Sequence, residues 1–95
     1  MGDDAVYVDE LRPTVPSAHW PFTRGCHMVS DDLTALHAMA EQIGMKRKWF
    51  QDGEHLQDGD HPHYDLTINK RRQALAAGAV EITAREWLAR ERSDG

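Results

Sequence analysis

The sequence predicts an α/β fold, with a small, mostly parallel sheet of about four strands and helices on its faces. Short apolar runs alternate along the chain with segments in which apolar residues recur at helical spacing. Gly44 and Gly78 follow two of the helical segments, where a C-terminal cap is expected. This alternation favours right-handed crossovers between parallel strands. Residues 1–95 are expected to form a single α/β domain.

Four segments are predicted as strands: residues 5–9, 26–29, 45–51 and 79–82. In the first, Val6 and Val8 fall on one face and Tyr7 on the other, as in a half-buried strand. Residues 11–24 contain three prolines, so this stretch is expected to be extended and irregular, with its aromatic side chains covering the core.

Three segments are predicted as helices: residues 33–43, 66–77 and 83–92. The first follows a capping cluster at residues 30–32. Either Asp65 or Thr67 would cap the second helix. The third begins with the pattern of a capping box, in which Thr83 and Glu86 each satisfy a backbone N–H group.

Composition and charge narrow the classes of function. The formal net charge is −5, which disfavours nucleic acid as a partner. Cys26 is the only cysteine, so an internal disulfide and a Cys-rich zinc site within one chain are excluded. The sequence has neither a signal-peptide pattern nor an apolar run of membrane-spanning length. We therefore expect a cytoplasmic protein that does not associate with membranes.

Polar residues gather after the predicted strands. Ligands of open parallel sheets bind beyond the carboxyl ends of the strands, where helix N-termini and loops converge. We therefore expect one edge of the sheet to carry Asp9, Ser30, Asp31, His63 and Asp65. A long polar loop, residues 52–64, lies at this edge, and loops of about 13 residues in small domains are usually functional or disordered.

The end of this loop supplies candidates for acid–base chemistry and for metal binding. His63 is the candidate for proton transfer, and Asp9 and Asp65 would orient it or hold a metal ion. His61, His63 and Asp65 could also supply nitrogen and oxygen ligands to a divalent metal such as Zn or Mn. The alternative is a polar lid in which Asp65 only caps a helix.

A basic cluster opens the second predicted helix and suggests an anion site. Lys70, Arg71 and Arg72 lie near the expected helix N-terminus, where backbone N–H groups and guanidinium groups suit phosphate or carboxylate. The alternative is a solvated basic helix face. His27 and Tyr64 complete the candidate ligand contacts, although Tyr64 could instead pack onto its own sheet.

Several short motifs resemble those of a family of small uncharacterised proteins from bacteria and their phages, known only as a domain of unknown function. The motifs are Val6-Tyr-Val-Asp9, Cys26-His-Met28, Leu36-His37-Ala38, Trp49-Phe50-Gln51, His63-Tyr-Asp-Leu66 and Gly78-Ala-Val-Glu81. The resemblance implies no activity. It implies that the family pattern includes Asp9, His27, His37, Trp49, His63, Tyr64 and Asp65. His19, His55 and His61 lie where such proteins vary in length, which weakens a metal site that depends on His61.

The leading hypothesis is a protein that binds a phosphorylated or nucleotide-like ligand at the C-terminal edge of its sheet, with hydrolysis of that ligand as a further step. The expected partner is a small anionic ligand, which Arg71 would contact. The rival hypothesis is a non-enzymatic interaction module, phage-encoded and acting on a host protein through an exposed loop and aromatic side chains. Basic groups that converge on a cleft would favour the first hypothesis, and a flat apolar edge the second.

Overall fold

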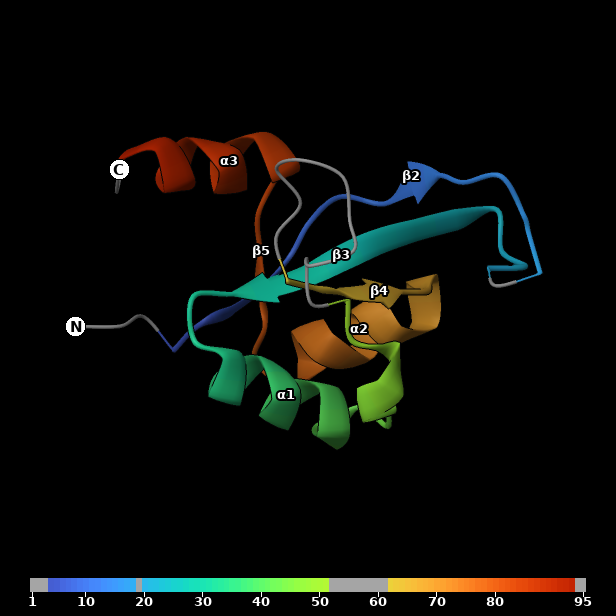
Figure 1. Ribbon diagram of the computed structural model, residues 1–95, viewed down its shortest axis with the longest axis horizontal. Coiled ribbons are helices and arrows are strands. Elements are labelled where there is room, and N and C mark those ends of the chain that lie inside the picture. Colours follow the sequence, from blue (N-terminus) through green and yellow to red (C-terminus); the bar gives the residue numbers. More distant parts are fainter. Residues whose placement is uncertain (1–3, 19, 52–61, 94–95) are drawn as a thin grey trace.

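The computed structural model describes residues 4–18, 20–51 and 62–93. In these stretches the chain forms a small α/β fold with a mixed sheet of five strands and three α-helices (Figure 1). The elements in chain order are β1 (Val6–Val8), β2 (Arg12–Pro13), β3 (Arg24–Ser30), α1 (Leu33–Gln42), the short 3₁₀ helix η1 (Arg47–Trp49), β4 (Tyr64–Leu66), α2 (Ile68–Ala76), β5 (Val80–Glu81) and α3 (Ala84–Ser93). None of these helices combines the length and apolarity that crossing a membrane requires.

The sheet is built around β3, and the prediction of a mostly parallel sheet is wrong. β1, β2 and β4 all pair with β3 in antiparallel orientation, whereas β5 pairs with β1 in parallel. The physical reason lies in the connection between β1 and β3. A parallel pair needs a crossover, usually a helix, but this proline-rich segment forms β2 and turns back along β3.

The chain from β1 to β2 carries one residue more than the part of β3 that faces it. Val8 pairs with Met28 and Arg12 pairs with Gly25, so four steps on one side face three on the other. An extra residue of this kind is a β-bulge, which locally disrupts the ladder and re-aims a side chain. Asp9 lies in this bulged stretch.

Helices cover the two faces of the sheet unequally. In Figure 1, α1 and α2 lie below the sheet and α3 above it. The larger core lies on the α1 and α2 side and includes Val8, Met28, Leu36, Tyr64 and Leu66, all fully buried. The smaller core lies under α3 and comprises Val29, Ile82 and Trp87 with Tyr7 packed against them. α3 covers the sheet at Tyr7 and Val29, whereas the side chain of His27, further along β3 on the same face, is 42% exposed.

The ends of the helices follow the predicted caps. Thr67, rather than Asp65, caps α2, because its hydroxyl accepts the Lys70 N–H at 3.2 Å. The capping box of α3 is confirmed, with the Thr83 hydroxyl accepting the Glu86 N–H at 3.0 Å and the Glu86 carboxylate accepting the Thr83 N–H at 3.2 Å. Gly44 and Gly78 have φ angles of 80° and 111°, which a residue without a side chain adopts at little cost.

Two segments differ in type from the prediction. The strand predicted at residues 45–51 is wrong, because local bonds from Trp49 N–H to Lys46 O and from Phe50 N–H to Arg47 O turn the chain into η1. The second helix was predicted to begin at residue 66, but residues 64–66 form β4 and pair with β3. Within residues 45–51 only Gln51 forms a β-bridge, with His63. Met45 and Phe50 pack against the core, whereas Trp49 is 42% exposed.

Candidate functional site

The backbone pairing of β1 with β3 is altered at Asp9, and its side chain takes over the missing bond. The Asp9 N–H donates to His27 O at 3.0 Å, as in an antiparallel ladder. The returning bond, from the His27 N–H, goes to Asp9 Oδ1 at 2.6 Å instead of to the Asp9 carbonyl. That carbonyl accepts from Arg71 Nε at 2.9 Å. Asp9 is 4% exposed, so its carboxylate is held in a nearly dry position.

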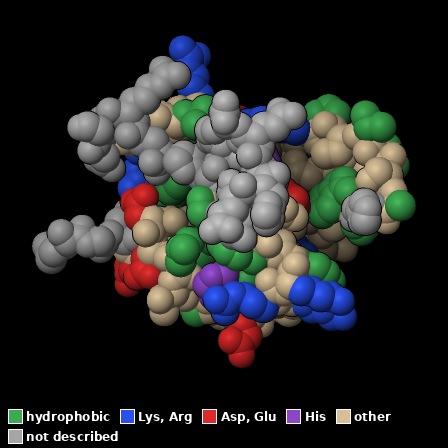
Figure 2. All heavy atoms as spheres, viewed as in Figure 1, with side chains coloured by type: hydrophobic (Ala, Val, Ile, Leu, Met, Phe, Trp, Pro, Cys, Tyr) green, Lys and Arg blue, Asp and Glu red, His purple; other side chains and the backbone are tan. Residues whose placement is uncertain are grey.

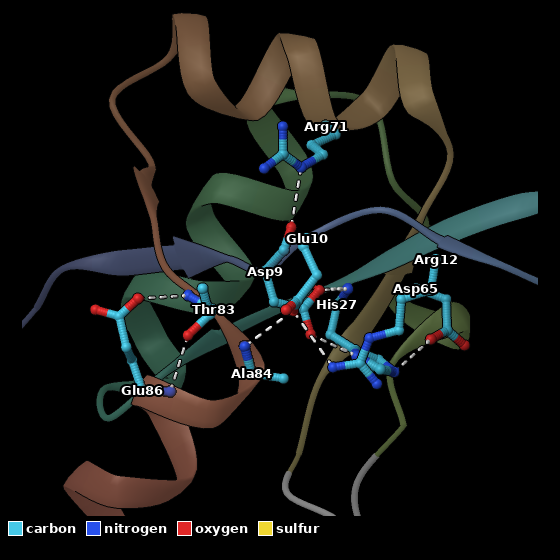
Figure 3. A network of polar contacts seen from close by, with 9 residues as sticks. All are labelled: Asp9, Glu10, Arg12, His27, Asp65, Arg71, Thr83, Ala84 and Glu86. Atoms are coloured by element: carbon cyan, nitrogen blue, oxygen red, sulfur yellow. Dashed lines mark hydrogen bonds and ion pairs between the residues drawn. The ribbon is translucent and has the colours of Figure 1, made fainter.

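The same carboxylate orients the His27 ring. Asp9 Oδ2 lies 2.8 Å from His27 Nδ1. An ionised carboxylate can only accept hydrogen bonds, so Nδ1 is the donor to Asp9, and in the neutral imidazole Nε2 is the nitrogen with the lone pair. Nε2 points toward Asp65, with 3.8 Å between Nε2 and Asp65 Oδ1. Figure 3 shows His27 between the two carboxylates.

Side chains from β3, from β4 and from the residue just before β4 meet at this point. His27 and Asp65 are directly paired across β3 and β4, and His63 lies two residues before Asp65, on the same face. His63 Nε2 is 3.4 Å from Asp65 Oδ1, and the two imidazole rings meet edge to face with centroids 4.8 Å apart. One ligand atom from each of His27, His63 and Asp65 lies within 4.8 Å of the other two. Two imidazole nitrogens and a carboxylate oxygen are a donor set that zinc and similar metals use.

A groove of about 230 Å³ adjoins these three residues. His27 and Asp65 belong to both the groove and the three-residue cluster. The rest of the lining comes from β2, β3 and the turn between them, and comprises Arg12, Pro13, Thr14, Trp20, Gly25 and Cys26. A ligand held at His27 and Asp65 would therefore extend toward the β2–β3 hairpin.

The predicted edge of the sheet is only partly correct. Asp9, His63 and Asp65 are brought together around His27, as expected. Ser30 and Asp31 lie at the far end of β3, because the antiparallel pairing reverses the directions of β1 and β3. There the Ser30 hydroxyl donates to Ala5 O at 2.7 Å, and Asp31 pairs with Arg90 at 2.8 Å.

The basic cluster of α2 does not converge on His63. Lys70 Nζ donates to Ile43 O near the C-terminal end of α1. Arg71 lies between the Asp9 carbonyl and Glu81, whose carboxylate is 3.1 Å away. Arg72 is exposed on the helix surface. α2 packs on the opposite face of the sheet from His63 and Asp65, so one phosphate cannot contact the helix N-terminus and His63 together.

Tyr64 lies on the buried side of β4. It is fully buried, and its hydroxyl is 2.7 Å from His37 Nδ1. The rings of Tyr64, His37 and Phe50 contact one another. These contacts place Tyr64 away from the groove. His61, the remaining predicted metal ligand, lies outside the described residues.

The contact between half-buried His37 and buried Tyr64 predicts a pH dependence of stability. Burial lowers the pKa of His37 below its usual value of 6.5, and the nearby Arg47 charge lowers it further. The unfolded chain therefore takes up a proton at a pH where folded His37 stays neutral. The contribution of His37 to the free energy of unfolding should be fully present above pH 6.5. It should decline as the pH falls from 6.5 to the lower pKa that His37 has in the folded chain. Urea unfolding between pH 8 and pH 5 should show a steeper decline for the unmodified chain than for His37→Gln, and equal declines would contradict this assignment.

Cys26 is not a nucleophile in this arrangement. Burial, with a smaller contribution from Asp9, raises the pKa of its thiol to about 12. The side chain belongs to the core on the α1 and α2 side, while that of its neighbour His27 faces the groove. A Cys–His pair is therefore excluded both by geometry and by protonation state.

Comparison with known protein families gives one match. Residues 6–94 match the family described as protein of unknown function (DUF4031). The chain belongs to this family. No curated protein and no solved structure matches it. The matched range contains every residue of the candidate site.

Some residues of the site were not predicted from the sequence of this DUF4031 protein. Arg12, Trp20 and Gly25 line the groove, but none of them was expected to contact a ligand, and Trp20 was expected to cover the core. His27 was expected to contact a ligand, and its place beside His63 and Asp65 depends on antiparallel pairing of β3 with β4. The sequence does contain a signal for a strand here. Polar and apolar side chains alternate in residues 63–66, which puts two polar groups on one face of a strand and two apolar groups on the other.

Proposed function

We propose that the protein binds one divalent metal ion, Zn or Mn, at His27, His63 and Asp65, and that the bound ion holds a small phosphorylated ligand. The observation that carries the proposal is the meeting of these three donors beside a carboxylate, Asp9, that fixes the His27 tautomer. The metal would take the His27 Nε2 lone pair, which already faces Asp65.

The Asp9–His27 pair supports a metal more than it supports simple packing. Ligating histidines usually donate their other ring N–H to a carboxylate or carbonyl group, which fixes the ring and raises its basicity. Asp9 has this relation to His27 at 2.8 Å. The bulge that turns the Asp9 carbonyl away from β3 frees the carboxylate for both contacts with His27.

A phosphorylated ligand fits such a centre because three protein ligands leave a coordination position for water or for a substrate oxygen. Arg12, which lines the adjoining groove, adds a positive charge on the same side. Hydrolysis of the phosphate ester would be the further step. A metal ion held by His27, His63 and Asp65 would supply charge that polarises the phosphate and would make water a stronger nucleophile at neutral pH.

One observation favours the rival function, a non-enzymatic interaction module. Apolar side chains gather over the turn between β2 and β3, at the right of Figure 2. Val15 in this turn is 89% exposed and Phe22 is also exposed. Exposed apolar groups of this kind suit a protein contact. Val15 and Phe22 are not among the three proposed metal ligands, His27, His63 and Asp65, so the two functions can be tested separately.

Metal titration tests the leading proposal. Calorimetry of the metal-free chain with Zn or Mn should give one ion per chain. Mutation of a residue that only orients a metal ligand typically weakens metal binding by about 10- to 100-fold. The variants His27→Ala, His63→Ala and Asp65→Ala should each weaken it by more than this. His37→Gln and Asp31→Asn are matched controls, because these residues lie on the other face and at the far end of β3. Binding that survives in all three variants, or no binding at all, would remove the proposal.

A further inference from the structure

We infer that the groove beside the metal-binding residues selects a phosphomonoester of a planar ring compound, a nucleoside monophosphate, with the phosphate at His27 and Asp65 and the ring against Trp20. This inference rests on the proposed function, because it names the class of ligand that the metal would hold. Its own support is the composition of the groove, which is lined by two of the three proposed metal ligands, His27 and Asp65, together with an arginine and a tryptophan.

Trp20 is held in place before any ligand arrives. Its Nε1 donates to Thr14 Oγ1 at 3.1 Å, and its backbone N–H contacts Ser17 Oγ at 3.1 Å. Its ring meets that of Phe22 edge to face, with centroids 5.0 Å apart. An indole fixed by these contacts loses little conformational entropy when a flat ring stacks on it.

Gly25 allows Trp20 to lie close against β3. A Cβ atom at Gly25 would be 2.8 Å from Trp20 Cζ2, closer than two carbon atoms can approach. Gly25 is two residues from His27 on the same face of the strand, so the indole borders the space beside the metal-binding residues. A larger residue would displace the indole from the groove.

Arg12 provides the positive charge at the groove. One of its terminal nitrogens lies 3.3 Å from Glu10 Oε1, which also accepts the Ala84 N–H at 2.9 Å. The bond from Ala84 lowers the pKa of Glu10, so this carboxylate stays ionised and restrains Arg12. A guanidinium has five N–H donors, and one contact to Glu10 leaves donors suited to a phosphate.

The size of the groove limits the ligand to a small molecule. Its volume of about 230 Å³ lies below the range usual for fully enclosed small-molecule sites, so the ligand would be partly exposed. A polynucleotide is disfavoured by the net charge of −5. A mononucleotide combines one phosphate with one flat ring, matching one metal centre and one indole.

Binding to the metal-loaded chain tests the inference with three probes: uridine 5′-monophosphate, ribose 5-phosphate and inorganic phosphate. The nucleotide should bind about 10-fold or more tightly than ribose 5-phosphate, since base stacking on an aromatic side chain contributes at this level. Trp20→Leu should remove this preference while the affinity for the metal stays unchanged. Trp20→Phe should keep part of the preference and covers the case in which the leucine variant does not fold.

Matched controls separate the two ends of the groove. Arg12→Gln should weaken all three probes by about 10-fold, as expected for one charge-assisted hydrogen bond, without changing the preference among them. Trp49→Leu should change nothing, because Trp49 is 42% exposed on η1 beside Lys46 and does not line the groove.

The possible outcomes test nucleotide selection by the groove separately from metal binding. Equal affinities for the nucleotide and ribose 5-phosphate, with metal bound, overturn the inference and leave the metal site standing. A preference that persists in both Trp20 variants also overturns it. If the chain binds no metal, the same comparison is run on the metal-free chain, where a preference lost in Trp20→Leu supports the groove and no preference overturns it.

Discussion

Replacing Asp9 by alanine should lower the free energy of unfolding by about 2 to 5 kcal/mol and weaken metal binding by about 10- to 100-fold. The loss of stability follows from the position of the carboxylate, which is 4% exposed and accepts from both the backbone N–H and Nδ1 of His27. Alanine removes both acceptors and leaves the His27 N–H without its partner. The loss of affinity follows because the His27 ring is no longer held with Nε2 toward Asp65.

Asp9→Asn separates the two effects. An asparagine side chain can still accept the His27 N–H through its oxygen, but it then turns an NH₂ group toward Nδ1. Nδ1 must become the acceptor, and the proton moves to Nε2, which can no longer bind a metal. We therefore expect this variant to be more stable than Asp9→Ala and to bind metal no better.

Urea unfolding and metal titration of both variants provide the measurement. Asp31→Asn is the control, because this carboxylate makes an exposed ion pair with Arg90 at the far end of β3. Asp9→Asn that binds metal as tightly as the unmodified chain would show that the tautomer of His27 does not depend on Asp9.

The parts of the fold that the sequence predicts correctly are those decided by local bonds. Thr83 and Glu86 cap each other across three residues, and the φ angles of Gly44 and Gly78 require only a missing side chain. The direction of the strands is not a local property. The same order of strands and helices suits a parallel or a mixed sheet, and the pairing of β1 with β3 is decided by a connection that contains no helix.

In the candidate site, too, some features are local to the sequence and others depend on pairing between distant segments. Asp9, His63 and Asp65 can be selected by residue type and by position at the end of a segment. Their meeting at His27 needs the register of β3 with β4 and the extra residue near Asp9, and both arise from pairing between distant segments. Lys70 shows the converse, since its position at a helix start suggests anion binding, yet its amine reaches a carbonyl at the end of another helix.

A large loss of stability outside the site is expected for Trp87→Ala. Trp87 is 7% exposed and anchors α3 to the sheet through Val29, Ile82 and Tyr7. Its ring lies 5.8 Å from that of Tyr7, and the Arg90 guanidinium contacts both rings. Removing a buried aromatic side chain of this size costs about 3 to 5 kcal/mol. Leu88→Ala on the same helix is the control, because Leu88 is 46% exposed and its loss should change stability by less than about 0.5 kcal/mol.

The Trp87 variant also tests whether the proposed metal site, the triad of His27, His63 and Asp65, is independent of α3. Trp87 packs over Tyr7 and Val29, whereas the triad draws on His27, His63 and Asp65. A ligand that binds only the folded chain stabilises it by about 2.7 kcal/mol at 100 times its dissociation constant. Zn or Mn should therefore raise the stability of Trp87→Ala by the same increment as that of the unmodified chain, and Trp87→Phe serves if the alanine variant is unfolded without metal. A smaller increment would mean that α3 helps to hold β3 in the geometry that the metal requires.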